Sequence, residues 1–161
     1  MVKHSISEIV KAVEIMSLKK IGALIVIERN TKVSEVLKEG INLSAKVSSE
    51  LIQNIFMPRT PLHDGAIVID KSEILAAKCI LPLASEVSVP KNLGTRHRAA
   101  VGITEISDAL VIVVSEETGI ISIIENGKLR RELTGDTLKE LLLTKLDRTK
   151  TGVNIKNIVK K

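Results

Sequence analysis

A cluster of cationic side chains stands at Arg96-His97-Arg98, directly after Thr95. The surrounding pattern predicts a helix from Gly94 to about Ser107, so these cations lie at its start, where the helix dipole disfavours each by about 0.3–1 kcal/mol. A bound anion would reverse that sign, because free backbone N–H groups, the Thr95 hydroxyl and the guanidinium groups all donate hydrogen bonds. The segment therefore indicates a phosphate or carboxylate site. The alternative is an exposed basic turn that pairs with surface acids.

A second segment with reactive side chains is His63-Asp64-Gly65-Ala66, which follows Pro61 and precedes an apolar run. The imidazole of His63 offers a metal ligand, and the carboxylate of Asp64 can hold a hydroxyl group. The small residues Gly65 and Ala66 would let a ligand approach the backbone closely. An ordinary Asp-Gly turn is the alternative interpretation.

The third segment, Ser115-Glu116-Glu117-Thr118-Gly119, ends the most apolar run of the chain. A solvated hairpin turn is one interpretation. The other is that the strand end delivers a carboxylate into a cleft, where it binds a divalent cation. Oxygen and imidazole ligands suit Mg²⁺ or Mn²⁺. Together the three segments supply a phosphate cradle, a metal pair and an acid that positions a hydroxyl, which a nucleotidyltransferase requires.

The elements that must position these segments alternate between helices and strands. Apolar periodicity and turn signals predict helices at Ser5–Lys20, Val33–Glu39, Ser48–Phe56, Gly94–Ser107 and Asp136–Leu146, and strands at Gly22–Glu28, Ala66–Asp70, Ile74–Leu83, Ala109–Ser115 and Ile120–Ile124. Ser5 with Glu8 is a candidate capping box, and Gly40 a candidate helix C-cap. The pattern predicts an α/β (α+β) fold with a mixed parallel/antiparallel central sheet flanked by helices, in a single domain over residues 1–146.

Composition restricts the function further. The chain has 161 residues, one Phe, no Tyr or Trp, and one cysteine, Cys79, among apolar neighbours. Recognition of single-stranded nucleic acid by aromatic stacking is therefore disfavoured, a disulfide within the chain is excluded, and Cys79 is expected in the core. Residues 144–161 carry six basic side chains and one acid, which accounts for the whole net charge of +5. We therefore expect a basic, flexible tail at 147–161 and no nucleic-acid partner.

Asp64-Gly65-Ala66 and Arg96-His97-Arg98 resemble the paired motifs of the diadenylate cyclase domain family. Lys20–Val26, Pro61–Ala66, Leu93–Ala100 and Val113–Gly119 are similar to family segments in the same order. The resemblance covers roughly Ile6 to Leu146 and is closest to the CdaA-type catalytic domain. The departures are Ile80, where such relatives often have Tyr, and Ala84, where they often have Ser.

The resemblance implies condensation of two ATP molecules into cyclic di-AMP with release of pyrophosphate. It implies that Asp64, Arg96 and Arg98 are catalytic and that His63 and Glu117 bind Mn²⁺ or Mg²⁺. The implied ATP-binding residues are Gly65, Ala66, Leu81, Thr95, Arg96, His97, Arg98, Ser115 and Glu116. Two domains are expected to pair face to face as a homodimer.

A catalytically silent nucleotide-binding or sensor module with the same fold is the alternative function. No apolar run approaches the roughly 18–20 residues that span a bilayer, and no secretory signal is recognised at the start. The chain as given is expected to be cytoplasmic, with any membrane contact made through a segment that it does not contain.

Overall fold

The computed structural model describes residues 3–37, 39–85 and 89–146. In chain order its elements are α1 (Lys3–Lys19), β1 (Ala23–Ile27), α2 (Val33–Val36), β2 (Ile41–Lys46), α3 (Ser49–Phe56), β3 (Ala66–Asp70), β4 (Glu73–Cys79), α4 (Thr95–Glu105), β5 (Leu110–Val114), β6 (Ile121–Glu125), β7 (Lys128–Leu133) and α5 (Gly135–Leu146). The strands form one sheet in the order β2-β4-β3-β1-β5-β6-β7. β1 and β3 are parallel, and every other neighbouring pair is antiparallel. The predicted mixed sheet flanked by helices is confirmed.

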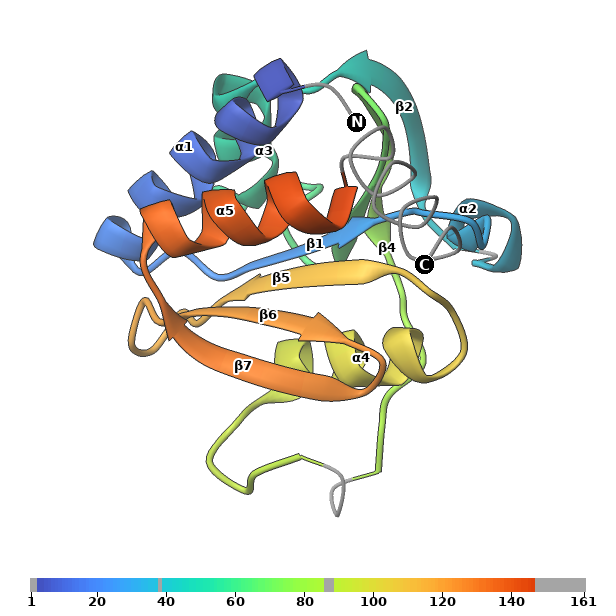
Figure 1. Ribbon diagram of the computed structural model, residues 1–161. Helices are drawn as coiled ribbons and strands as arrows, with labels where there is room; N and C mark the ends of the chain where they lie inside the picture. The colour runs from blue at the N-terminus through green and yellow to red at the C-terminus, as the bar shows by residue number, and fades with distance from the viewer. Residues whose placement is uncertain (1–2, 38, 86–88, 147–161) are drawn as a thin grey trace, which may run out of the picture.

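Helices cover both faces of this sheet (Figure 1). α1, α3 and α5 pack on one face, and α4 packs on the other. Alternate residues of β1 enter the two cores: Ile25 and Ile27 face α1, whereas Leu24 and Val26 face α4. Because both faces are covered, β1 and β5 are apolar and buried throughout. The cores are almost wholly aliphatic, and Cys79 is buried in the second one, as predicted.

The register of the central strands decides which loops meet. Ala23 pairs with Val114 of β5, so one step further along the ladder places Gly22 opposite Ser115. Ile25 pairs with Ile67 of β3, and three steps back in the same parallel register Gly22 lies opposite Asp64. The start of β1, the start of β3 and the end of β5 therefore share one edge of the sheet.

Two local predictions at helix ends were wrong. Ser5 is a buried residue within α1, and the Glu8 carboxylate accepts a hydrogen bond from the backbone N–H of Ser49 at 3.0 Å, so it caps α3 instead. α2 ends at Val36, and Gly40 precedes a strand instead of capping a helix. At α3 the predicted cap is confirmed, since Ser48 Oγ accepts from the N–H of Leu51 at 3.1 Å.

The strand predictions missed the two edges of the sheet. β2 and β7 are largely exposed and polar, and they form by pairing with β4 and β6. Strand β4 ends at Cys79, not at Leu83, because the chain leaves the sheet there and crosses to α4. Gly102 of α4 lets the segment after β4 lie directly against this helix, since a Cβ at position 102 would overlap the carbonyl oxygen of Pro82.

The basic tail at 147–161 lies outside the described residues. Among the helices that are described, none has the length and apolar character needed to cross a bilayer.

Candidate active site

Arg96 occupies the centre of the shared sheet edge. Its guanidinium lies on the backbone of Gly22, where an added Cβ would come within 2.5 Å of Arg96 Cζ. On its other side, Arg96 Nη1 lies 3.3 Å from Glu116 Oε2. The first helical turn, the start of β1 and the loop after β5 are thus joined through one guanidinium.

The first turn of α4 remains open to an anion. Its N-cap is Gly94, which has no side chain to accept from the first backbone N–H groups. No acidic residue lies in this turn, so the exposed Thr95 and the half-buried Arg96 lie at the helix start without the carboxylate that commonly occupies it. The predicted alternative, a basic turn paired with a surface acid, is also seen, because Arg96 pairs with Glu116. Since the Glu116 side chain is 64% exposed, a ligand phosphate can displace this pair at low cost.

The loop before β3 holds Asp64 at the surface. Gly65 has φ +119°, and a Cβ there would lie 2.9 Å from the carbonyl oxygen of Cys79, so the loop presses against the end of β4. Asp64 itself is exposed. His63 Nδ1 lies 2.7 Å from the carbonyl oxygen of Thr60 and donates to it, which leaves Nε2 as the ring nitrogen able to bind a metal.

The loop after β5 is fixed by its own hydrogen bonds. Ser115 Oγ accepts from the N–H groups of Glu117 and Thr118, each at 3.2 Å. Gly119 has φ +77°, and its carbonyl accepts from Ser17 Oγ of α1 at 2.5 Å. The exposed carboxylates of Glu116 and Glu117 are thereby held at the sheet edge. Within the described part of the chain, no three His, Cys, Asp or Glu side chains are grouped to hold a metal ion.

Three of the predicted residues point elsewhere. Arg98 Nε donates to the carbonyl oxygen of Ala84 at 3.2 Å, and the Ala84 N–H donates to the Arg98 carbonyl at 3.0 Å. His97 is only 5% exposed, and its Nε2 has no hydrogen-bond partner among the described residues. Burial lowers the pKa of His97, and the charges of Arg131 and Arg96 lower it further, so this ring is neutral at pH 7. Leu81 is buried in the core on the α4 side.

The sequence analysis assigned Gly22 no role in the chemistry; it treated this residue as the start of a strand and as part of the family-like segment Lys20–Val26. A glycine directly before a buried strand is a position where another group can approach the backbone closely. Gly22 fits this description, but the sequence does not show which side chain approaches its backbone.

Comparison with known proteins agrees with this geometry. A family model described as "DisA bacterial checkpoint controller nucleotide-binding" (DAC) matches residues 10–129. The chain is 55% identical over 140 residues to the cyclic di-AMP synthase CdaA of Bacillus subtilis, covering 87% of this chain and 51% of that protein. It is 48% identical over 143 residues to a diadenylate cyclase of Listeria monocytogenes, covering 89% and 52% of the two chains. The chain therefore spans about half the length of these curated relatives.

Solved structures give the same result. A crystal structure of a DacA double mutant from Staphylococcus aureus superimposes with a TM-score of 0.84 at 46% identity, covering 88% of this chain and 94% of that one. A protein from Bacillus cereus, described as a hypothetical membrane spanning protein, gives a TM-score of 0.77 at 45% identity, covering 80% and 63%. The family match runs from within α1 to the start of β7 and includes α4 and all three motif segments. The chain belongs to the DAC family of DisA-type nucleotide-binding domains.

Proposed function

We propose that this chain condenses two molecules of ATP into cyclic di-3′,5′-AMP and releases two molecules of pyrophosphate. The observation that carries the proposal is the arrangement around Gly22. One guanidinium, that of Arg96, joins the helix start to the Ser115–Glu116 loop, and the register places Asp64 at the same edge. Membership of a family whose curated relatives are named diadenylate cyclases supports it.

Each half-reaction is a displacement at phosphorus. The 3′-hydroxyl oxygen of one ATP forms a bond to the α-phosphorus of the other, its proton is released to water, and the bond from that phosphorus to the bridging oxygen of pyrophosphate breaks. Arg96, the Thr95 hydroxyl and the open N–H groups of α4 would bind the triphosphate, with Ser115 and Glu116 at its far end. Gly65 and Ala66 leave room for the nucleotide beside the backbone.

Asp64 is proposed to orient the attacking hydroxyl. It is exposed, and a carboxylate is a weak base toward an alcohol. Its main contribution is therefore alignment of the hydroxyl with the phosphorus. Arg98 and His97 are proposed to support the site indirectly. Arg98 ties α4 to the segment at Ala84, and neutral His97 packs beneath the helix start. Leu81 would contact adenine only at the edge of the core in which it is buried.

A divalent cation, Mn²⁺ or Mg²⁺, fits the side chains present. Thr60 fixes the tautomer of His63 so that Nε2 can bind a metal, and Glu117 offers an exposed carboxylate on the loop after β5, two strands away at the same edge of the sheet. When bound, the ion would neutralise charge on the phosphates.

The product has twofold symmetry, so each half of the reaction requires its own ATP and its own Asp64. We propose that two copies of the domain meet face to face as a homodimer, each holding one ATP. Any membrane anchor would lie outside residues 3–146, and the domain would act on the cytoplasmic side, where ATP is available.

The test is to incubate the purified chain with ATP and Mn²⁺, then with Mg²⁺, and identify the products by chromatography and mass spectrometry. Cyclic di-AMP with pyrophosphate is expected. Asp64→Asn should lose turnover while it still binds ATP, whereas the control Asp136→Asn, at an exposed position on α5, should keep both. ATP binding without product in the unchanged chain, at low and high protein concentration alike, would instead identify a silent nucleotide-binding module.

A further inference from the structure

Three buried polar atoms interrupt the otherwise aliphatic core on the α4 side of the sheet. They are Nε2 of His97, Oγ of Ser122 and Nε of Arg131, and none of them has a hydrogen-bond partner among the described residues. Buried polar atoms are normally hydrogen-bonded, so a group of this kind requires an explanation. The proposed function gives a part to His97 but none to the other two.

The end of α4 is fixed to the turn between β6 and β7. The N–H of Gly127, in that turn, donates to Thr104 Oγ at 3.0 Å, and Figure 1 shows α4 running along these two strands. His97 precedes Thr104 by seven residues, which is two helical turns or about 10.5 Å. The two side chains therefore share one face of the helix, and His97 faces β6 and β7.

The strands place the other two polar side chains at the same level. Arg130 pairs with Ile123, which lies in the core on the α1 side, so the next residue, Arg131, points to the α4 side. Ser122, directly before Ile123, points to the α4 side for the same reason. Each lies three residues, about 10 Å, from the last residue pair beside the turn. Ser122 and Arg131 thus lie opposite His97.

Arg131 brings a positive charge to this position. Its side chain is half-buried, and a guanidinium stays charged at any pH that the fold withstands. No ion pair between described residues includes it. Its charge reaches the His97 ring, whose pKa is lowered first by burial, next by Arg131 and then by Arg96. The charges of two guanidiniums therefore act on one neutral ring, in a place where an acid is expected.

The first turn of α4 connects these charges to the anion site. The N–H of Arg98 donates to the carbonyl oxygen of Gly94 at 3.2 Å, so the helix itself leaves open the N–H groups of Thr95, Arg96 and His97. His97 thus contributes its backbone N–H to the anion site, while its ring packs in the core towards Arg131. The charge of Arg131 lies one residue behind the proposed phosphate cradle.

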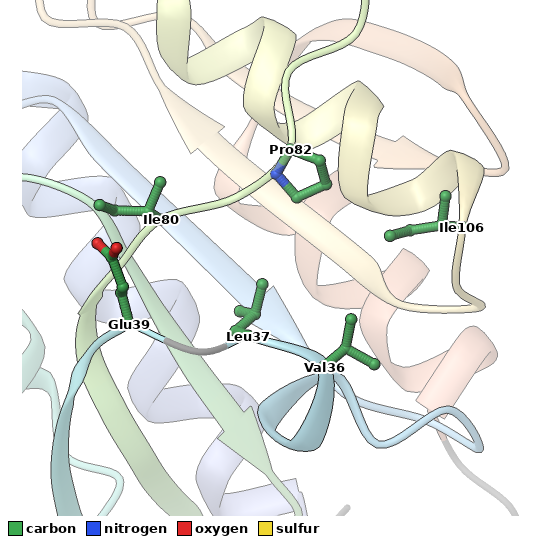
Figure 2. A pocket seen from close by; sticks show the side chains of 6 residues that line it. All are labelled: Val36, Leu37, Glu39, Ile80, Pro82 and Ile106. Atoms are coloured by element: carbon green, nitrogen blue, oxygen red, sulfur yellow. The ribbon is translucent and has the colours of Figure 1, made fainter.

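The apolar pocket drawn in Figure 2 does not supply the missing acid. It is lined by Val36, Leu37, Glu39, Ile80, Pro82 and Ile106. Pro82 meets α4 at Gly102, which is two residues before Thr104 and so about 200° around the helix from it. The pocket and its one acid, Glu39, therefore lie on the other side of α4 from Arg131.

We propose that Arg131 belongs to the nucleotide site through its charge: it lies beneath the start of α4, makes no contact with the nucleotide, and strengthens the binding of each added phosphate. The inference rests on the proposed binding of ATP at the start of α4. It adds a residue from β7 to a site otherwise built from the three motif segments. A purely structural role for Arg131 is the competing explanation.

The test is calorimetric titration with 3′-deoxy-ATP and 3′-deoxy-AMP, which lack the attacking hydroxyl and so bind without turnover. Arg131→Gln should weaken the binding of 3′-deoxy-ATP about tenfold, which corresponds to about 1.4 kcal/mol. It should weaken that of 3′-deoxy-AMP less than about twofold, because the attraction grows with the charge of the ligand. Arg131→Lys keeps the charge and should recover most of the affinity. Arg130→Gln is the matched control, an exposed arginine on the opposite face of β7 that should leave both affinities unchanged.

A second measurement follows the His97 ring by nuclear magnetic resonance during a pH titration. Arg131→Gln should raise the pKa of His97, because it removes one of the two charges that lower it. Arg131→Lys and Arg130→Gln should leave that pKa near its value in the unchanged chain. A purely structural role would not give this pattern of charge dependence.

The outcomes separate this inference from the proposed reaction. Equal losses of 3′-deoxy-ATP and 3′-deoxy-AMP affinity that Arg131→Lys does not recover would show a structural role and refute the inference. Unchanged affinity for both ligands in Arg131→Gln would refute it too, even if the chain makes cyclic di-AMP. The expected losses in a chain that makes no cyclic di-AMP would refute the reaction and uphold the role of Arg131. A chain that binds neither ligand would refute both.

Discussion

The guanidinium of Arg96 lies on the backbone of Gly22, and this contact holds the start of α4 against the start of β1. Gly22 is not in a conformation reserved for glycine, so its importance is the space it leaves. The contact therefore predicts that a side chain at position 22 would disturb the position of Arg96.

Gly22→Ala should push the Arg96 guanidinium from its position, because the new Cβ would come within 2.5–2.9 Å of its three terminal atoms. The expected loss of cyclase activity is about 10- to 100-fold, the range associated with a displacement of about 1 Å in a catalytic group. The free energy of unfolding should change by less than about 1 kcal/mol, since the clash is with the end of a flexible side chain. Steady-state rates and thermal unfolding measure the two effects.

The control is the double variant with Arg96→Ala. If Gly22→Ala acts through Arg96, it should cost little further activity once that side chain is gone. Full additivity of the two losses would show that Gly22 has a separate role.

His63→Ala should weaken Mn²⁺ binding by at least about tenfold, because removal of the ring deletes a proposed ligand whose free nitrogen is oriented by Thr60. His4→Ala is the control, since His4 is an exposed histidine on α1. Calorimetric titration with Mn²⁺ alone tests binding without turnover. Equal affinities in the two variants would exclude His63 as a ligand.

Under the proposed pairing, turnover should rise more steeply than in proportion to protein concentration, because each product molecule would require two copies of the site. At low concentration the slope of log rate against log concentration should approach about two, and it should fall toward about one when pairing is complete. Initial rates over a wide range of concentration, combined with light scattering, test this expectation. Strict proportionality in a sample that stays monomeric would contradict the face-to-face arrangement.

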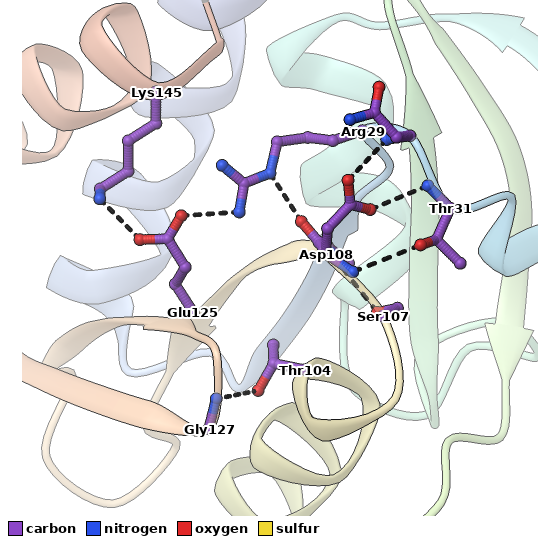
Figure 3. Close-up of polar contacts among 10 residues, drawn as sticks. Arg29, Thr31, Thr104, Ser107, Asp108, Glu125, Gly127 and Lys145 are labelled. Carbon is purple, nitrogen blue, oxygen red and sulfur yellow. Dashed lines mark hydrogen bonds and ion pairs between the residues drawn. The ribbon is translucent and has the colours of Figure 1, made fainter.

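Glu125 pairs with Lys145 of α5 and with Arg29 after β1, each at 2.6 Å (Figure 3). Acid should weaken this network, which ties α5 to the end of β1. Burial by itself raises the pKa of Glu125, but hydrogen bonds from Lys145 and Arg29, together with their charges, outweigh it and lower the pKa below its ordinary value of 4.5. A lowered pKa means that the ionised group stabilises the fold above about pH 4.5, and that this stabilisation is lost as the pH falls through the folded value. Asp108 has a lowered pKa as well, with burial opposed by N–H donors from Thr31 and Asn30.

Glu125→Gln should therefore destabilise the chain by about 1–2 kcal/mol at pH 7, and the difference should shrink as the pH falls below about 4.5. Thermal unfolding at a series of pH values measures this difference. Glu140→Gln, at an exposed position on α5, should show a small difference that does not follow this course. A constant difference for Glu125→Gln would mean that its charge contributes nothing to the network.

Deletion of residues 147–161 should leave the proposed cyclase activity within about twofold of the full chain, because every residue proposed to contact ATP or the metal ion lies between His63 and Glu117. Product formation by the truncated and full chains at equal concentration measures the effect. A large loss of activity would show that the tail contributes to the site or to pairing.

The sequence by itself determined the central elements of this protein and pointed to the three segments proposed to carry its chemistry. β1 and β5 are continuous apolar runs because they are buried on both faces, and such runs are visible without a structure. The three motif segments were recognised from their residue types. Local chemistry also predicted the Ser48 cap, which depends on a hydrogen bond only three residues away.

Only the tertiary structure decided which distant groups meet. The strands β2 and β7 exist because a neighbour supplies their hydrogen-bond partners, so their own sequences carry little signal. Glu8 caps α3 across a sequence distance of 41 residues, which defeated the local capping prediction. The contact between Gly22 and Arg96 has the same origin: the register of β1 and the crossing of α4 bring together residues that share no local pattern.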